Sequence, residues 1–485
     1  MILKDFDITQ RSKTIFLLSF VKVCCLVIAL ILSSAMVARA ATFTVNLGGD
    51  NGDLTCDATC TLRDAIDDAN TALSDDAIIF APGLTVITLT NEIVINNRGK
   101  LTITGRGANV FTIDGGAGQN RIFFANAASL ILRNLTLTGG NGAGATFNSN
   151  GGAIYAFGGS MTLDHVHVTG NTATGGGPAG GIFFAGGFAP TNNRIINSTF
   201  SANVSNTSCG GFYSGGDTLV IVNSTFSGNS ARTGGAFCSD SNTILRNVTI
   251  SGNTTDQGGG AFYHGAGTLN FANSIIAGNT ATTGAPEILN PNPGNVISNG
   301  NNIIGDSPGD ATNTPNSIAY QATDMLDTSP LLGALENYGG TTPTLRLLAA
   351  SPAIDRGNNA LATDPSNNDT PFSRDQRDYK RIVFGNSAEI VDIGAYEYNS
   401  TPAAGVMLSG KVTARNRGAA RVRITLTAAN GESRTATTNP FGYYGFKDVR
   451  AGETYTLTAR SKQFTFASQE VNVYEDLNNV NFTSP

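Results

Sequence analysis

Acid–base chemistry in this sequence would have to come from very few side chains. Only three histidines occur. His165 and His167 alternate in a stretch with strand character, so they are expected to share one face. His264 follows a tyrosine at a predicted turn. Because no carboxylate partner can be assigned to any of them, surface or stacked histidines are favoured over a general base.

Charged residues at predicted strand positions are equally sparse. Glycoside hydrolysis needs two carboxylates that flank the bond, and a lyase needs a basic side chain that removes a proton beside a carboxylate. The candidates fall on different repeats and form no cluster in the sequence: Arg133, Asp164, Asp217, Asp240 and Arg246. We therefore assign no catalytic residue and no cofactor-binding residue.

An acidic run at residues 363–381 is the candidate for metal binding. It contains four aspartates: Asp364, Asp369, Asp375 and Asp378. Carboxylate oxygens at alternating loop positions can bind Ca²⁺. Their spacing matches no defined calcium loop, so a solvated loop with local salt bridges is the favoured interpretation. Ca²⁺ stays open as the alternative, and no other cofactor is expected.

A repeated polar phrase must position these residues. It begins as HVHVTGN at His165 and returns as NSTFSAN, NSTFSGN, NVTISGN and NSIIAGN at intervals of 24 to 32 residues, accompanied by a Gly-Gly phrase. Between the phrases, apolar residues alternate with the period of a strand. A repeat of this length predicts coils that contact only their neighbours, and the sequence therefore predicts an all-β, right-handed parallel β-helix.

An asparagine closes each phrase. We expect these residues to share one corner, to tolerate its left-handed backbone, and to form a ladder of amide hydrogen bonds between coils: Asn171, Asn203, Asn229, Asn253 and Asn279. Aromatic residues recur beside the Gly-Gly phrase, namely Phe183, Phe212, Tyr213, Phe237, Phe262 and Tyr263. Stacking inside the core is favoured for them over a sugar-binding face.

The chain divides into segments of different character. Residues 1–40 predict a signal peptide, with basic residues, an apolar run and an A-x-A cleavage pattern ending at Ala40. The following segments are an N-terminal cap (41–80), the β-helix (81–283), an irregular C-terminal cap packed on the last coils (284–399), a linker (400–405) and a small β-sandwich (406–485). The N-terminal cap contains a short amphipathic helix with a Thr61–Asp64 capping box.

Four cysteines follow the predicted signal peptide. Cys56 and Cys60 are close enough to form a disulfide, which export permits. Cys209 precedes its Gly-Gly and Cys238 follows its own, so we expect them to lie beyond bonding distance.

The balance of charged residues limits the classes of partner that the protein can bind. Residues 41–404 carry 15 Lys and Arg against 28 Asp and Glu, whereas residues 405–485 carry 10 against 6. An acidic main region argues against nucleic acid, whose binding requires phosphates to be neutralised. No further apolar run is long enough for a membrane helix after signal cleavage.

Several phrases resemble known families. TCDATCTLRDAIDDAN, GNNIIGD, SPLLGALENYGGTTPTLRLLAASPAIDRG and DIGAYEY resemble bacterial right-handed parallel β-helix proteins of the choice-of-anchor Q type, which have the pectin-lyase-like fold. The GGA and F-x-x-N elements are similar to repeats of chlamydial polymorphic membrane proteins, which are surface adhesins. The tail, from SGKVTARNRG onward, resembles the carboxypeptidase regulatory-like, prealbumin-like sandwich, an accessory module that implies no peptidase activity.

Together these features predict a secreted or cell-surface protein that acts without catalysis. Its expected role is adhesion or carbohydrate binding, with extracellular polysaccharide or a host or neighbouring cell surface as partner. The resemblance leaves two alternatives open: a polysaccharide lyase or glycoside hydrolase of the pectin-lyase-like fold, and a structural component of the cell envelope or matrix.

Overall fold

The computed structural model describes residues 40–485 apart from 72–73, 97–98, 117, 119, 187–191, 217, 292–294, 308–317, 384–388, 399–405, 416, 429–432, 450–452, 474–476 and 485. The predicted signal peptide up to residue 39, Asp217 and the predicted linker therefore lie outside the described residues. None of the helices in the described part combines the length and the apolar character needed to cross a membrane.

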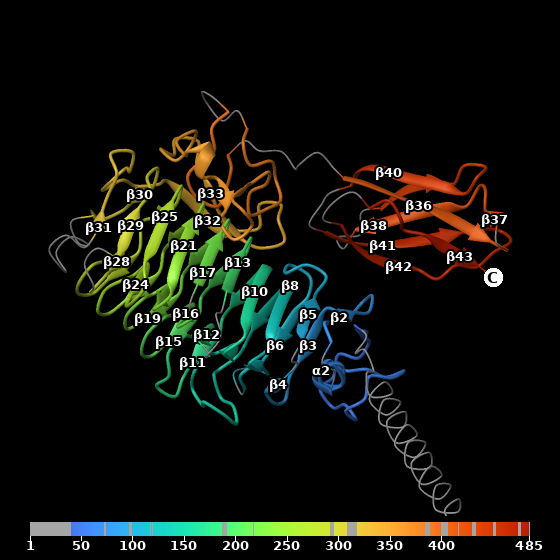
Figure 1. The fold of residues 1–485 in the computed structure, drawn as a ribbon, viewed down its shortest axis with the longest axis horizontal. Coiled ribbons are helices and arrows are strands. Elements are labelled where there is room, and N and C mark those ends of the chain that lie inside the picture. Colours follow the sequence, from blue (N-terminus) through green and yellow to red (C-terminus); the bar gives the residue numbers. More distant parts are fainter. Residues whose placement is uncertain are drawn as a thin grey trace, which may run out of the picture. The chain divides into compact units, whose positions relative to one another are not determined.

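Successive coils of parallel strands dominate the structure (Figure 1). The largest sheet contains β1 (Thr42–Val45), β2 (Asp76–Phe80), β3 (Val86–Thr88), β5 (Lys100–Thr104), β6 (Thr112–Asp114), β8 (Ser129–Thr138), β10 (Ser160–Thr169), β13 (Asn192–Ile196), β14 (Thr199–Ser201), β17 (Thr218–Val222), β18 (Thr225–Ser227), β21 (Asn242–Arg246), β22 (Thr249–Ser251), β25 (Leu269–Ala272), β26 (Ile275–Ile276), β29 (Val296–Ser298), β30 (Ile303–Ile304) and β31 (Ile318–Ala319).

Two further parallel sheets form the other sides of the coils, and the second of them runs only from Thr172 to Ala281. One contains β4 (Ile93–Ile95), β7 (Phe123–Asn126), β9 (Ile154–Phe157), β12 (Ile182–Ala185), β16 (Phe212–Ser214), β20 (Phe237–Ser239), β24 (Phe262–His264) and β28 (Ile288–Leu289). The other contains β11 (Thr172–Ala173), β15 (Val204–Ser205), β19 (Ser230–Ala231), β23 (Thr254–Thr255) and β27 (Thr280–Ala281). These stacked parallel sheets confirm the predicted β-helix.

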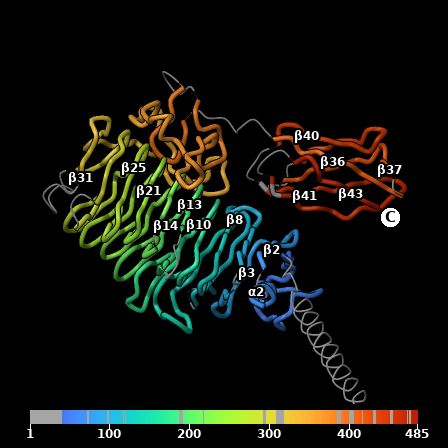
Figure 2. The backbone as a smooth tube through the Cα atoms, in the orientation of Figure 1, coloured from blue at the N-terminus to red at the C-terminus, as the bar shows by residue number. Residues whose placement is uncertain are grey.

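The register follows the repeat in the sequence. Phe200 pairs with Phe226, and Phe226 pairs with Ile250, so equivalent phrase positions lie one above another. Parallel pairing begins at Thr42 and reaches Ala319, which is further in both directions than the predicted bounds of 81 and 283. The smooth trace in Figure 2 shows the coils as a regular series.

Close approach between coils explains the Gly-Gly phrase. A Cβ atom at Gly210 would lie 2.1 Å from the carbonyl oxygen of Gly235, and one at Gly235 would lie 2.4 Å from that of Gly260. No side chain fits at such distances, so this corner of each coil requires glycine.

The helix α2 (Leu62–Thr71) covers the first coils and packs against β1, β2 and β4. Thr61 and Asp64 form the predicted capping box: the Asp64 backbone N–H donates to Thr61 Oγ1 at 3.2 Å, and the Thr61 N–H donates to Asp64 Oδ2 at 2.9 Å. Four apolar residues of the helix are fully buried in the core: Leu62, Ala65, Ile66 and Ala69. The helix thus shields the apolar end of the solenoid.

The segment after the coils contains two small antiparallel pairs and one short 3₁₀ helix. The pairs are β32 (Leu332–Glu336) with β33 (Thr344–Leu347) and β34 (Thr363–Asp364) with β35 (Thr370–Pro371), and the 3₁₀ helix is η1 (Asn359–Leu361). The described residues of 332–398, here called the C-terminal segment, lie along the outer side of the coils from His165 to Asn301. The predicted cap on the last coils is therefore too narrow a description.

The remaining strands form two four-stranded sheets around a core of their own. One sheet contains β36 (Val406–Ala414), β37 (Arg417–Gly418), β40 (Tyr443–Val449) and β43 (Phe482–Ser484); the other contains β38 (Arg423–Ala428), β39 (Ser433–Thr437), β41 (Glu453–Arg460) and β42 (Gln469–Val473). Buried residues such as Leu408, Ile424 and Leu457 lie between the two sheets. This is the small sandwich expected at the C-terminus.

Candidate functional site: the groove along the bend row

The largest sheet bends once per coil, and each bend has a residue in the left-handed conformation. These residues, here called the bend row, are Asn134, His165, Asn197, Asn223, Asn247, Asn273 and Asn301, with φ between 45° and 58°. Asn is the non-glycine residue that adopts this conformation most readily. The bend row therefore uses the first asparagine of each repeated phrase, with one histidine among them.

The predicted ladder lies at a different corner. Side-chain amides donate to the next coil at 2.8 to 3.0 Å, running from Asn171 through Asn203, Asn229 and Asn253 to Asn279. All five residues are buried. None of them has a positive φ; the residue before each has it instead, for example Gly228 before Asn229. The expectation of a left-handed backbone at the ladder was wrong, because the glycine or alanine before each ladder asparagine has that conformation, as does the bend-row residue that begins the phrase.

The ladder ends on a buried carboxyl group. Asn279 donates to Glu287 Oε2 at 2.6 Å, and the backbone N–H of Gly278 donates to Glu287 Oε1 at 3.0 Å. Burial outweighs these hydrogen bonds and raises the pKa of Glu287 to about 8. Glu287 thus takes the place of the next asparagine.

The C-terminal segment binds to the bend row. Side-chain amides of four bend-row residues donate to its backbone carbonyls: Asn223 to Arg374, Asn247 to Asp392, Asn273 to Asn358 and Asn301 to Arg356, at 2.9 to 3.3 Å. The asparagines that bend the sheet therefore also hold the segment that covers it.

His165 makes the corresponding contact through charge. Its Nδ1 lies 2.8 Å from Asp164 Oδ1, and its Nε2 lies 2.9 Å from Asp378 Oδ2. Burial alone would lower the pKa of His165, but the two carboxylates raise it well above its ordinary value. Arg133 adds a second cation 3.5 Å from Asp164. The prediction that Arg133 and Asp164 belong to no cluster was wrong, because neighbouring coils bring them together and the C-terminal segment adds Asp378.

A surface pocket of about 210 Å³ opens beside this cluster. Residues of two coils and of the C-terminal segment line it, and Asn197, Phe372, Arg374 and Asp364 are among them. Arg194 pairs with Asp364 at 2.5 Å. The side-chain oxygen of Asn197 is shielded from solvent and accepts no hydrogen bond from the described protein atoms. The pocket therefore offers a guanidinium and a half-buried aromatic side chain to a ligand, while the Asn197 oxygen in its lining is a buried acceptor.

The charged groups around His165 are already paired. Although burial would raise the pKa of Asp164, the neighbouring cations lower it overall, so it stays ionised. A protonated His165 between two carboxylates has no lone pair with which to accept a proton. His167 bonds Ser201 at 2.8 Å, and burial lowers its pKa to about 4, so it is neutral. The geometry gives none of these groups the role of a general base at neutral pH.

His264 and the other candidate charges lie away from this cluster. His264 is buried on β24, where its Nε2 contacts the carbonyl oxygen of Gly267 at 3.2 Å. Asp240 accepts a hydrogen bond from the Tyr213 hydroxyl at 2.9 Å, and Arg246 donates to Asn299 at 3.3 Å.

The acidic run was expected to be a solvated loop with local salt bridges, and this holds only in part: residues 366–371, with Asp369, are exposed, whereas residues 375–377 are buried. Asp375 is fully buried and pairs with Arg377 at 2.5 Å. The Arg377 guanidinium lies 3.6 Å from the Tyr396 ring centroid, which stabilises a buried cation. Arg381 is buried too and donates to Asn223 at 2.9 Å. No group of three acidic, histidine or cysteine residues in the described ranges could hold a metal ion.

The recurring aromatic residues form two rows rather than one. Phe212, Phe237 and Phe262 lie in the core, with ring centroids 5.1 Å apart between the last two. Phe183 and Tyr213 lie on the outer side, half-buried, and stack at 4.4 Å with an interplanar angle of 16°. Since stacked rings cover each other's faces, the outer row presents mainly edges to solvent, which weakens the sugar-stacking alternative there.

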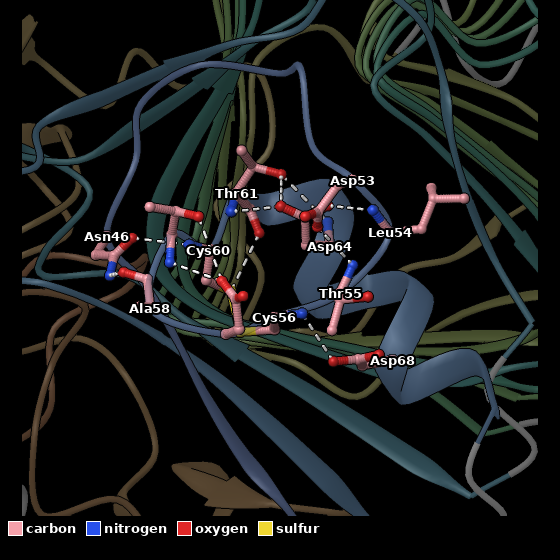
Figure 3. Close-up of a disulfide and its surroundings, with 12 residues drawn as sticks. Asn46, Asp53, Leu54, Thr55, Cys56, Ala58, Cys60, Thr61, Asp64 and Asp68 are labelled. Atoms are coloured by element: carbon pink, nitrogen blue, oxygen red, sulfur yellow. Dashed lines mark hydrogen bonds between the residues drawn. A yellow bond between two sulfur atoms is a disulfide. The ribbon is translucent and has the colours of Figure 1, made fainter.

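Both cysteine pairs are disulfides. Cys56 and Cys60 are joined in the loop before α2, where the Cys56 N–H donates to Asp68 and the Cys60 N–H donates to Asn46, each at 2.9 Å (Figure 3). Cys209 and Cys238 are also bonded, with a Cα–Cα distance of 5.1 Å.

The expectation that Cys209 and Cys238 lie too far apart was wrong. It assumed an extended backbone at this corner. Cys209 instead has φ 65°, and Gly234, the matching position one coil later, has φ 69°. A Cβ at Gly234 would lie 2.6 Å from Cys238 Sγ, so this corner aims a side chain at the residue four positions on. The same turn directs Cys209 toward Cys238 of the neighbouring coil.

The signal for the groove was present in the sequence. HVHVTGN is the one phrase of the series that begins with histidine where the others begin with asparagine. A different residue type at a repeated position indicates that its side chain has a different partner. That partner, Asp378, could not be identified because it lies more than 200 residues away in the chain.

Comparisons with known proteins cover parts of the chain. The curated proteins contain no match to it. Among solved structures, it is similar to the crystal structure of Jun a 1, the major allergen from cedar pollen, with 15% sequence identity and a TM-score of 0.35, over 64% of this chain and 84% of that chain. Residues 407–484 match the family model of the carboxypeptidase regulatory-like domain, so the C-terminal sandwich is a domain of that family.

Proposed function

We propose that this is an exported, non-catalytic surface or secreted protein that binds extracellular polysaccharide and acts in adhesion. The pocket beside the bend row carries the proposal. Its lining combines Arg374 with Phe372, and these side chains can bind the hydroxyls and the apolar face of a sugar. The choice-of-anchor Q resemblance of the sequence is consistent with this role.

The paired state of the nearby charges supports a binding role over a catalytic one. Catalysis of sugar cleavage needs a group that exchanges a proton near the working pH. Here Asp164 and Asp378 both face the His165 ring, and Asp364 faces Arg194. These pairs hold the wall of the pocket, whose lining also includes Arg374 and Asn197.

Affinity electrophoresis through gels that contain a neutral or an acidic polysaccharide tests the proposal. The chain from Ala41 onward should be retarded, and Arg374→Ala or Phe372→Ala should weaken binding about tenfold. Lys380→Ala, an exposed change outside the pocket lining, is the matched control. A chain that no polysaccharide retards, or pocket variants that bind as the control does, would overturn the proposal.

A further inference from the structure

Two aromatic side chains of the sandwich are exposed on one turn and are separated in sequence by Gly442. Phe441 is 71% exposed, the highest value among the large apolar side chains of the described residues, and Tyr443 is 52% exposed. Single exposed apolar residues are common on protein surfaces, but two neighbouring aromatic rings on one turn leave apolar surface in water without gain in folding. We therefore sought a ligand that these rings fit.

The turn that carries the two rings is well ordered by hydrogen bonds. The side-chain oxygen of Asn439 accepts from the backbone N–H groups of Phe441 at 2.9 Å and of Tyr443 at 3.0 Å. Gly442 has φ 87°, and a Cβ there would lie 2.4 Å from the Val412 carbonyl oxygen. Because the backbone is fixed before any ligand arrives, ordering it costs little on binding.

Positive charge lies beside the rings. Lys411 pairs with Tyr443 across β36 and β40, and its Nζ lies 5.0 Å from the Tyr443 ring centroid. Lys447 follows on the same face of β40, two alternations after Tyr443. The alternate residues on this face include two lysines and no carboxylate: Met407, Ser409, Lys411 and Thr413 of β36, and Tyr443, Gly445 and Lys447 of β40.

The charge of the sandwich is opposite to that of the β-helix region. Residues 405–485 carry 10 Lys and Arg against 6 Asp and Glu, whereas residues 41–404 carry 15 against 28. An anionic polymer would be attracted to the sandwich and repelled by the rest of the chain. The positive charge of the sandwich therefore favours an anionic polymer as its ligand.

We infer that Phe441, Tyr443, Lys411 and Lys447 form a binding site for an acidic polysaccharide, such as a polymer of uronic acids. The flat rings would contact the C–H faces of the sugar rings, and the two ammonium groups would pair with carboxylates along the polymer. This deepens the proposed function, on which it rests for the class of polymer, and it adds a site separate from the pocket beside the bend row.

The test uses the chain from Ala41 onward and measures its dissociation constants for polygalacturonate, neutral dextran and duplex DNA. The combined variant Phe441→Ala/Tyr443→Ala should bind polygalacturonate at least about tenfold more weakly. Phe147→Ala, which removes a 45% exposed aromatic ring of the β-helix region, is the matched control. Lys411→Ala/Lys447→Ala should also weaken binding and reduce its dependence on salt, compared with the exposed Lys462→Ala.

Unchanged thermal unfolding shows that each variant is folded; Phe441→Ala alone, at the most exposed position, serves if the double variant is not. Binding of polygalacturonate by wild type and ring variants alike would overturn the inference and leave the proposed function intact. Equal affinity for duplex DNA would overturn it too, since the site would then recognise charge alone. Absence of binding to every polysaccharide would contradict the proposed function itself.

Discussion

The Nε2 atom of His165 lies 2.9 Å from Oδ2 of Asp378, and this ion pair joins a coil of the β-helix to the C-terminal segment. At the equivalent place in four later coils, an asparagine amide donates to a backbone carbonyl of the same segment. One structural position therefore performs two tasks along the solenoid: it bends the sheet and it holds the segment that forms one wall of the groove.

Replacing His165 by asparagine separates these two tasks. The His165→Asn variant keeps a residue suited to φ 55° but loses the contact with Asp378. Since removing one partner of a buried ion pair leaves an uncompensated charge, we expect the free energy of unfolding to fall by about 3 kcal/mol. Denaturant unfolding measures the loss, and limited proteolysis should cut residues 332–398 faster. The outer change Thr162→Asn is the control, and equal protease resistance of both variants would contradict this role.

A substitution in the middle of the asparagine ladder should lower the stability of the fold. In Asn229→Ala, the N–H groups of Asn203 lose their acceptor, and the Phe200 carbonyl loses its donor. Leaving buried polar groups unpaired costs about 1–3 kcal/mol each, so a loss of at least 3 kcal/mol is expected. Chemical denaturation measures it. The exposed Asn192→Ala should change the stability by less than about 0.5 kcal/mol; a similar small change at Asn229 would show that the ladder does not stabilise the fold.

The two disulfides should contribute unequally to stability. Cys209 and Cys238 are 29 residues apart in the sequence, whereas Cys56 and Cys60 are four apart. A longer closed loop restricts the unfolded chain more, which gives about 3.5 kcal/mol for the first bond and about 2 kcal/mol for the second. Melting temperatures of Cys209→Ala/Cys238→Ala and Cys56→Ala/Cys60→Ala compare them. The reverse order would mean that native contacts, not loop closure, decide their effect.

Stability should fall as the pH rises from about 4 to about 9. Burial raises the pKa of Asp392 to about 7, of Glu287 to about 8 and of Glu397 to about 9. A carboxyl group whose pKa is higher in the folded than in the unfolded state holds its proton more tightly when folded. Its contribution is full below the unfolded pKa near 4 and is lost as the pH passes through the folded values.

Thermal unfolding across this range measures the effect. Glu287→Gln should remove the part of the decline that runs from about pH 4 to about pH 8, because the amide does not titrate. A melting temperature that stays constant or rises between these pH values would show that these carboxyl groups are ionised in the folded protein.

The fold could be predicted because it is repeated. Phe200, Phe226 and Ile250 fall at the same phrase position, so the register follows from counting residues. The ladder partners follow from the same counting. Which asparagine of a phrase has the left-handed backbone does not follow from counting, because asparagine at either position suits that conformation and only the path of the chain decides between them.

The groove could not be predicted because its contacts are long-range. Asp378, Asp364 and Arg374 come from a segment with no repeat, and no local pattern shows where it lies on the coils. The polar composition of residues 363–381 predicts that they are exposed to solvent. Asp375 is nevertheless buried, because Arg377 and backbone N–H groups compensate its charge. Composition describes a segment by itself, whereas the burial of its residues depends on which other parts of the chain pack against it.

Turnover is the most direct test of the central claim that this protein binds polysaccharide without cleaving it. The purified chain from Ala41 onward is incubated with acidic and neutral polysaccharides, with and without Ca²⁺, and assayed both for unsaturated or reducing ends and for retention on insoluble polymer. The account predicts retention, weakened by Arg374→Ala, with no product above the buffer control. Product formation by the pure chain, lost on substitution of a groove residue such as Asp164 or His165, would contradict it.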